Sequence, residues 1–144
     1  MILIAHRGNT NGPNPEKENN PGYIMEALAL GYNVEVDVWF VNGEFLLGHD
    51  APVYVVPENF FKTPRLWVHC KDVLTFYKFT VFMPYCNSFF HSTDDVVLTT
   101  QGYLWTYPGK PLYSKSICVL PEWKPSPNIT GACGICSDFI KDWV

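Results

Sequence analysis

The chain has 144 residues, enough for one domain with a sizeable hydrophobic core. Its net charge of −4, without any cluster of lysine and arginine, excludes a basic nucleic-acid-binding surface, and no apolar run reaches the roughly 20 residues of a membrane-spanning helix. Nearly half of the residues are apolar, so we expect a globular protein rather than a disordered one.

The cysteines give a first indication of the compartment. There are five of them, an odd number, and no secretion signal precedes the first predicted strand. We therefore expect free thiols and a cytoplasmic protein. Cys133 and Cys136 have the C-x-x-C spacing of redox and zinc sites, but no second pair of ligands accompanies them at zinc-finger spacing. We interpret them as two small buried residues near the last strand.

The N-terminal residues predict a strand followed by a helix. Residues 1–5 are apolar and run directly into His6, Arg7 and Gly8, and α/β proteins commonly bind ligands beyond the carboxyl end of such a strand. A polar loop follows. Residues 20–31 then predict a helix, because asparagine suits the N-cap, proline the first turn and glycine the residue after the last turn.

The next segment alternates between apolar and acidic residues. Residues 34–41 predict a strand, parallel to the first, whose valines face one side while Glu35 and Asp37 face the other. Two carboxylates on one face of an apolar strand are costly to bury without partners. An Asn-Gly turn then predicts a hairpin with residues 44–47, which delivers His49.

The remaining segments predict strands with few helices between them. In residues 65–71, a third main strand, Trp67, His69 and Lys71 share one face. A short helix is expected at residues 73–78. Further strand patterns follow, and the connections between them hold Gly and Pro and are too short for crossover helices. These five strands are residues 88–91, 96–99, 103–107, 117–120 and 134–139.

Three motifs together resemble those of the glycerophosphodiester phosphodiesterase family. They are His6-Arg7-Gly8, Glu35-x-Asp37 and His49-Asp50, and their order and spacing match, including the intervening helix and the strand-turn-strand. Members of that family are (β/α)₈ barrels with the active site at the carboxyl ends of the strands. The resemblance implies that the acid–base catalysts are His6 and His49, the phosphate-binding residues Arg7 and Lys71, and the metal ligands Glu35 and Asp37.

The residue types agree with that chemistry. Hydrolysis of an anionic phosphodiester needs charge neutralisation, a base and an acid. Glu35 and Asp37 lie about 7 Å apart along an extended strand, close enough to hold one divalent cation, and carboxylate oxygens suit Mg²⁺ or Ca²⁺. The alternative is a purely structural pair of salt bridges from these carboxylates to Arg7 and Lys71.

His69 stands where the family usually has a glutamate, and three interpretations remain open. As a third metal ligand beside the two carboxylates it would favour Mn²⁺ or Zn²⁺. It could instead donate to phosphate or to a metal ligand, or serve only for packing. Glu18 either orients the site or caps the first helix, and Asp138 either matches an acidic residue near the family's last strand or is a cap or surface acid. We interpret His91 as pocket lining.

The chain is short for the fold that the resemblance implies. A full (β/α)₈ barrel has about 250 residues. We therefore expect one α/β domain over residues 1–144, folded as a compact, reduced (β/α) TIM-like barrel with helices mainly in the first half and few in the second. Strand faces left without helices would be exposed apolar patches, which favours a homo-oligomer.

Together these features predict a metal-dependent phosphodiesterase. It would hydrolyse a small glycerophosphodiester-like substrate to an alcohol and a phosphomonoester, with no nucleic-acid partner and no membrane span. Two alternatives remain. One is a phospholipase-D-like lyase, as in the related sphingomyelinase D toxins, and the other is a non-catalytic relative that only binds metal or phosphate.

Overall fold

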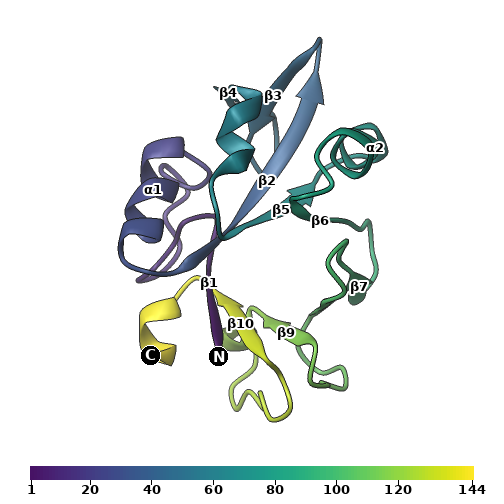
Figure 1. Cartoon of the computed structure of the whole chain (residues 1–144). Coiled ribbons are helices and arrows are strands. Elements are labelled where there is room, and N and C mark those ends of the chain that lie inside the picture. The colour runs from purple at the N-terminus through teal and green to yellow at the C-terminus, as the bar shows by residue number, and fades with distance from the viewer.

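A computed structural model describes residues 1–144, whose ten strands form one sheet that curls into a half-barrel (Figure 1). Two α-helices lie outside the sheet, and none of the helices combines the length and the apolar composition needed to cross a membrane. In chain order the elements are β1 (Ile2–His6), α1 (Pro21–Ala29), β2 (Asn33–Val41), β3 (Glu44–Leu47), β4 (Tyr54–Val56), the 3₁₀ helix η1 (Glu58–Lys62), β5 (Leu66–Cys70), α2 (Val73–Phe82), β6 (Asn87–Phe90), β7 (Val96–Leu98), β8 (Leu104–Thr106), β9 (Ser116–Val119), the 3₁₀ helix η2 (Pro121–Trp123), β10 (Gly134–Ser137) and the 3₁₀ helix η3 (Ile140–Trp143).

Seven of the ten strands are parallel, in the spatial order β6-β5-β2-β1-β10-β9-β8. At the centre of this order, β1 pairs with β2 on one side and with the last strand, β10, on the other. Strands β3 and β4 extend β2 in antiparallel fashion, and β7 pairs antiparallel with β8. Because the seven strands run the same way, their carboxyl ends share one edge of the sheet.

The expected TIM-like barrel with helices in the first half is wrong. The chain is mostly sheet, the sheet is mixed rather than parallel, and only two α-helices accompany the ten strands. The antiparallel strands β3, β4 and β7 take up chain that a regular barrel would use for crossover helices. The connections that follow β8 and β9 are rich in proline, which removes a helix hydrogen bond and clashes with the preceding turn, so neither contains an α-helix.

Most individual elements nevertheless match their sequence patterns. The first strand, helix and strand are confirmed, and α1 begins where its signals place it. The Asn20 side chain accepts a 2.8 Å hydrogen bond from the Gly22 N–H, Pro21 is the first helical residue, and Gly31 has a φ of +97°. The five short strands of the second half are present as β6 to β10, each within two residues of its predicted bounds.

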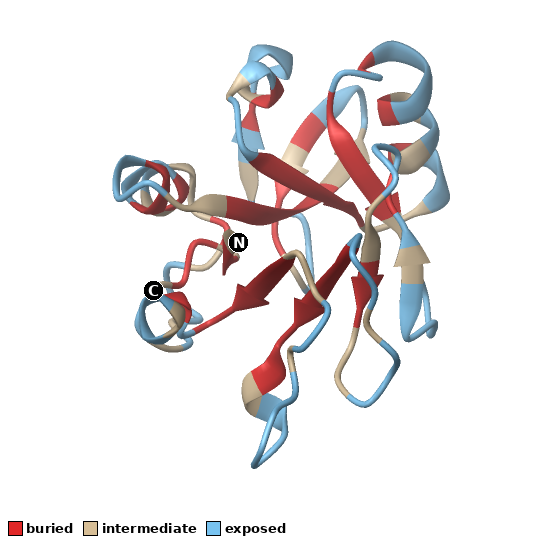
Figure 2. Ribbon diagram, turned by 60° about the horizontal axis from the view of Figure 1, so that its bottom comes forward, coloured by how far each residue is buried: buried red, intermediate tan, exposed pale blue.

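A hydrophobic layer lies on each side of the sheet. On the side that carries the helices, the valines of β2 pack with residues of α1 and α2. Inside the curl, a second cluster contains large rings such as Trp67, Phe89 and Trp105. Figure 2 shows the result, with most strands buried and the exposed residues mainly in loops and on helix surfaces. By strand alternation, Glu35 and Asp37 face the inside of the curl.

Gly48 fixes the backbone between the hairpin and His49. Its N–H donates to the carbonyl oxygen of Asp37 (3.1 Å), and its own carbonyl oxygen accepts from the indole N–H of Trp39 (2.7 Å). A Cβ at this position would overlap the carbonyl oxygen of Ala51, so glycine is required. These hydrogen bonds therefore fix the backbone of His49 close to the backbone of Asp37.

Gly48→Ala should lower the free energy of unfolding by about 2–4 kcal/mol, because the added methyl group meets backbone rather than a movable side chain. The matched control is Gly43→Ala at the hairpin tip, where φ is +80° but a Cβ meets nothing within 4 Å. There we expect a loss of only about 1 kcal/mol. Urea-induced unfolding followed by circular dichroism measures both losses, and equal values would contradict the steric role of Gly48.

Candidate functional site

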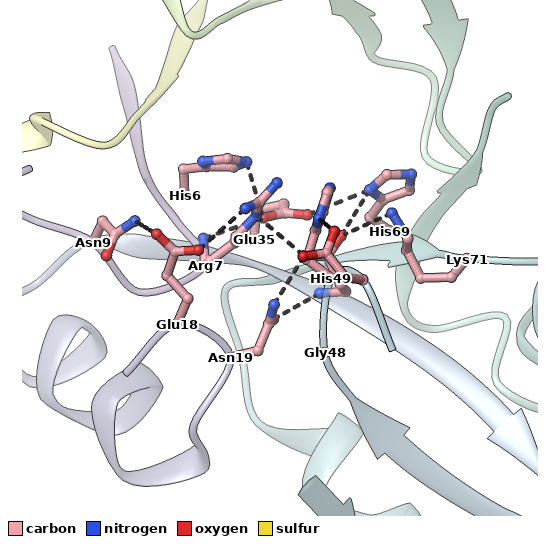
Figure 3. A network of polar contacts seen from close by, with 12 residues as sticks. His6, Arg7, Asn9, Glu18, Asn19, Glu35, Gly48, His49, His69 and Lys71 are labelled. Carbon is pink, nitrogen blue, oxygen red and sulfur yellow. Dashed lines mark hydrogen bonds and ion pairs between the residues drawn. The ribbon is translucent and has the colours of Figure 1, made fainter. Parts of the chain in front are cut away.

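Three neighbouring strands bring acidic and basic side chains to one edge of the sheet. Strand register places Glu35 of β2 beside His6 of β1, and Asp37 beside His69 of β5. Both carboxylate residues are only 1% exposed. Figure 3 shows Glu35, His69 and Lys71 pointing toward a common centre. The parallel pairing of β2 with β1 and β5 therefore supplies basic partners for the two buried carboxylates, which the alternation of β2 alone does not provide.

The two carboxylates and His69 form a compact group. Nδ1 of His69 lies 3.0 Å from Oδ1 of Asp37 and 3.6 Å from Oε1 of Glu35. One potential ligand atom from each of the three residues lies within 4.8 Å of the other two. Of the three interpretations of His69, these distances agree with that of a third metal ligand beside Glu35 and Asp37.

Two longer basic side chains complete the cluster. Nε of Arg7 lies 3.3 Å from Oδ2 of Asp37, and Nζ of Lys71 lies 3.7 Å from Oδ1. Arg7 has a φ of +54°, and its backbone N–H donates to Oε2 of Glu35 (3.2 Å). Its guanidinium also donates to Glu18 (3.1 Å). Asp37 thus forms the salt bridges to Arg7 and Lys71 that the sequence left as an alternative to metal binding, whereas Glu35 contacts Arg7 only through its backbone N–H.

These contacts set the protonation states of the cluster. Burial alone would raise the pKa of Asp37, but the hydrogen bond and charge of His69, with the charges of Arg7 and Lys71, hold that pKa well below its usual range. Burial alone would lower the pKa of His69, but Asp37 and Glu35 raise it above its usual value. The salt-bridged arrangement therefore favours an ionised Asp37 and a protonated His69.

The donor set fits a divalent cation. Oδ1 of Asp37 and Nε of Arg7 are both buried and lack a well-directed hydrogen bond. An unsatisfied buried acceptor is costly, and a cation would satisfy it. Two carboxylates and one imidazole with ligand atoms within 4.8 Å suit ion-to-ligand distances of about 2.0–2.6 Å. Glu35, Asp37 and His69 are therefore the residues that would hold Mg²⁺, Ca²⁺, Mn²⁺ or Zn²⁺.

His6 and His49 share one feature, a carboxylate at Nδ1. Nδ1 of His6 lies 2.8 Å from Oδ1 of Asp138, and Nδ1 of His49 lies 2.7 Å from Oδ1 of Asp50. A carboxylate at Nδ1 fixes the ring orientation and leaves Nε2 free for a ligand. Nε2 of His6 is 3.9 Å from Oε2 of Glu35, at the border of the cluster.

The two histidines differ in their surroundings. His6 is buried, and although burial alone lowers its pKa, the hydrogen bond to Asp138 and the charge of Glu35 raise it. The His49 side chain is 40% exposed and reaches the site through the backbone of Gly48 rather than through contacts with the carboxylates. The structure therefore gathers six of the seven predicted site residues into one polar network (Figure 3), whereas the His49 side chain pairs only with Asp50.

Two asparagines that the sequence did not mark hold the site together. Asn19, which is 1% exposed, donates to Oδ2 of Asp37 and accepts from the Asp37 N–H, both at 2.9 Å. Asn9 is fully buried and donates to Glu18 (2.9 Å) and Asp138 (2.8 Å). Glu18 therefore orients the site rather than capping α1, and Asp138 holds His6. The asparagine-rich composition predicted a loop here, but not which of its residues are buried.

Glu122 fixes the backbone that carries Asp138. It lies in η2, directly after β9, and its carboxylate accepts from the Asp138 N–H (2.9 Å) and from the Ser137 hydroxyl (3.0 Å). The Ser137 oxygen accepts in turn from the Phe139 N–H (2.9 Å). One side chain thus ties the end of β9 to the end of β10 and positions the partner of His6.

Aromatic rings lie behind His69. Its imidazole lies nearly parallel to the rings of Phe89 and His91, with centroids 5.0 and 4.6 Å away. The hydroxyl of Tyr107 lies 3.4 Å from Nε2 of His91. Burial, followed by the charges of His69 and Lys71, lowers the pKa of His91 to about 4. His91 is therefore a neutral ring that fixes the plane of His69.

Glu122→Ala should lower the free energy of unfolding by about 1–2 kcal/mol, because the Asp138 N–H loses its acceptor. It should also shift the downfield proton resonance of the hydrogen bond between His6 and Asp138. Glu122→Gln keeps one carbonyl acceptor and should lose less than half as much stability. Urea unfolding and proton NMR measure the two effects, with Glu16→Ala at an exposed glutamate as the control. An unshifted resonance in Glu122→Ala would contradict the positioning role.

The lowered pKa of His91 makes stability depend on pH. The unfolded chain binds the proton near pH 6.5 and the folded chain only near pH 4, so the free energy of unfolding falls as the pH decreases between these values. After a discount for partial exposure we expect a loss of about 1–2 kcal/mol. His91→Phe keeps a stacked ring and should remove this loss. Thermal unfolding at several pH values compares the two proteins, and parallel curves would contradict the prediction.

Comparison with known proteins adds no assignment. No protein-family model, no curated protein and no solved structure matches the chain. What the site does must therefore follow from its own geometry and from the chemistry of its residues.

Proposed function

We propose that this chain is a divalent-metal-dependent phosphodiesterase, which hydrolyses a glycerophosphodiester-like substrate to an alcohol and a phosphomonoester. The observation that carries the proposal is the buried group of Glu35, Asp37 and His69, with the guanidinium of Arg7 and the ammonium of Lys71 directly beside it. Acidic ligands next to two phosphate-binding cations suit a substrate that is itself an anion held on a metal.

The ligand group would hold the cation, which would neutralise charge on the phosphate oxygens and polarise the phosphorus centre. Mg²⁺ and Ca²⁺ suit the two carboxylates, while the imidazole of His69 extends the choice to Mn²⁺ and Zn²⁺. His69 must be neutral to serve as a ligand, so binding of the cation would release the proton that the salt-bridged arrangement favours.

Arg7 and Lys71 would bind the phosphate. Both now contact Asp37, and a carboxylate engaged with a cation needs these partners less. The guanidinium offers two parallel N–H donors to phosphate oxygens, whereas the ammonium acts as a compact positive charge. Glu18 and Asn19 fix the loop around Arg7 and Asp37, so the basic groups would meet substrate from a rigid frame.

His6 and His49 would divide the acid and base roles. Each has a carboxylate at Nδ1 and a free Nε2, which is the arrangement that general acid–base catalysis requires of an imidazole. A substrate hydroxyl next to the phosphate could attack first and give a cyclic phosphate, which water would then open. His6 is positioned by Asp138 and Glu122, whereas the more exposed His49 would complete the site from the hairpin side.

The motif order supports the same proposal, since it resembles that of the glycerophosphodiester phosphodiesterases in every position except His69. We also propose that the protein works in the cytoplasm. All five cysteines are free, which suits a reducing compartment.

Two measurements on one set of variants test the proposal. Calorimetric titration with Mg²⁺, Ca²⁺, Mn²⁺ and Zn²⁺ should detect one site per chain, and Asp37→Asn or His69→Ala should weaken it at least about tenfold. Asp95→Asn, at a surface aspartate paired with Lys110, is the control and should bind like the wild type. His6→Ala and His49→Ala should keep the metal site but lower kcat by about 10²–10⁴.

Phosphorus NMR of the reaction identifies the product. A phosphomonoester from a water-soluble glycerophosphodiester is the expected result. A cyclic phosphate released from a choline lysolipid as the final product would favour the lyase instead. Metal binding with no turnover of any diester would overturn the enzymatic assignment and leave a metal-binding protein.

A further inference from the structure

Helix α2 is apolar on both of its faces. Thr75 and Phe79 are buried against the sheet, where the helix contacts β2, β5 and β6. The opposite face is apolar as well, and Lys78 is the only charged residue in the helix. The large apolar side chains exposed there, with their exposed fractions, are Val73 (65%), Leu74 (51%), Tyr77 (52%), Val81 (51%) and Phe82 (58%). A helix that is apolar all round is normally covered on all sides.

The exposed side chains form an ordered ridge rather than a scatter. Leu74, Tyr77 and Val81 are spaced three and four residues apart, so they lie in one row along the outward side of α2. This spacing is the one that packs against another helix. By contrast, the exposed apolar residues Met25, in α1, and Leu30, at its C-cap, are not on such a row. Figure 1 shows α1 and α2 at separate places along the outside of the sheet, so α1 does not cover the ridge.

A groove runs beside the ridge. It has a volume of about 700 Å³ and lies between α2 and the strands β3 and β4, with Phe40, Phe45, Val56 and Phe82 among its lining residues. Nζ of Lys78 lies over the rings of Phe40 (4.9 Å) and Phe82 (5.1 Å). Two glutamates, Glu44 and Glu58, also line this groove. One patch therefore carries an apolar ridge, an apolar groove and charges of both signs.

We propose that this patch is the interface of a homodimer, in which α2 packs antiparallel against α2 of a second copy of the chain. A two-fold contact brings the same patch together from both sides, so the patch must be complementary to itself. The patch is complementary to itself in shape, because the apolar ridge of each copy would pack beside the apolar groove of the other. Lys78 and the glutamates satisfy the condition in charge, since the lysine of each copy would meet the acidic side of the other.

The charges argue against a lipid surface as the occupant. Binding of an apolar helix to an anionic membrane draws on lysine and arginine around the apolar face. Here the groove carries two glutamates against one lysine, and the whole chain has a net charge of −4. The inference is independent of the proposed phosphodiesterase activity, because it rests on no residue of the metal and phosphate site.

Sedimentation velocity of the full chain over a hundredfold range of concentration tests the proposal. The wild type should form a dimer that dissociates on dilution. Val81→Glu should raise the dissociation constant at least about a hundredfold, because the two-fold contact buries the added carboxylate twice. Met25→Glu is the matched control, since Met25 on α1 is 49% exposed against 51% for Val81. It should dimerise like the wild type.

A second variant guards against a folding defect. Leu74→Gln introduces no charge, and it should weaken the dimer about tenfold. Thermal unfolding checks that each variant is folded. A wild type that stays monomeric throughout, or a dimer that Val81→Glu leaves intact, would overturn the proposal. So would a monomer that binds vesicles of phosphatidylcholine and phosphatidylglycerol through α2.

Discussion

The burial of two carboxylates on β2 is the constraint on which the rest of the site depends. Glu35 and Asp37 are almost completely removed from water, and an isolated charge in that position is strongly unfavourable. Parallel pairing resolves this, because β1 and β5 place Arg7, His69 and Lys71 around the same two side chains. The neighbouring loop supplies the remaining hydrogen bonds. A bound cation would supply the same compensation, and Arg7 and Lys71 would then be released from Asp37.

Local sequence patterns were sufficient to predict the inner part of this site. The alternation of β2 determines that both acids lie on one face, and the same alternation in β5 puts His69 and Lys71 on one face as well. The register between β2 and β5 then places Asp37 beside His69. The roles of Asn19 and Glu122 could not be predicted. The composition of a polar loop does not show that the Asn19 side chain will be buried. Glu122 meets Asp138 only through the neighbouring ends of β9 and β10.

The same patterns could not give the overall fold. They located nine of the ten strands to within two residues and missed β4, but a strand pattern says nothing about what covers the strand or which way its neighbour runs. The expectation of a TIM-like barrel came from the resemblance of the motifs, which occupy only the first fifty residues. The Asn42-Gly43 turn was correctly interpreted as a hairpin, yet its consequence was missed: a hairpin extended by β4 makes the sheet mixed.

The small number of helices has two effects on the structure. Where no helix follows a strand, the strand end must be held by other means, and Glu122 and Gly48 show how side-chain and backbone hydrogen bonds take over that task close to the site. Where a helix does follow, as α2 follows β5, it lacks the neighbours that would cover its flanks and outer face. The chain can therefore support a buried charged site on few elements, but only by leaving an apolar helix surface, which we propose a second copy of the chain covers.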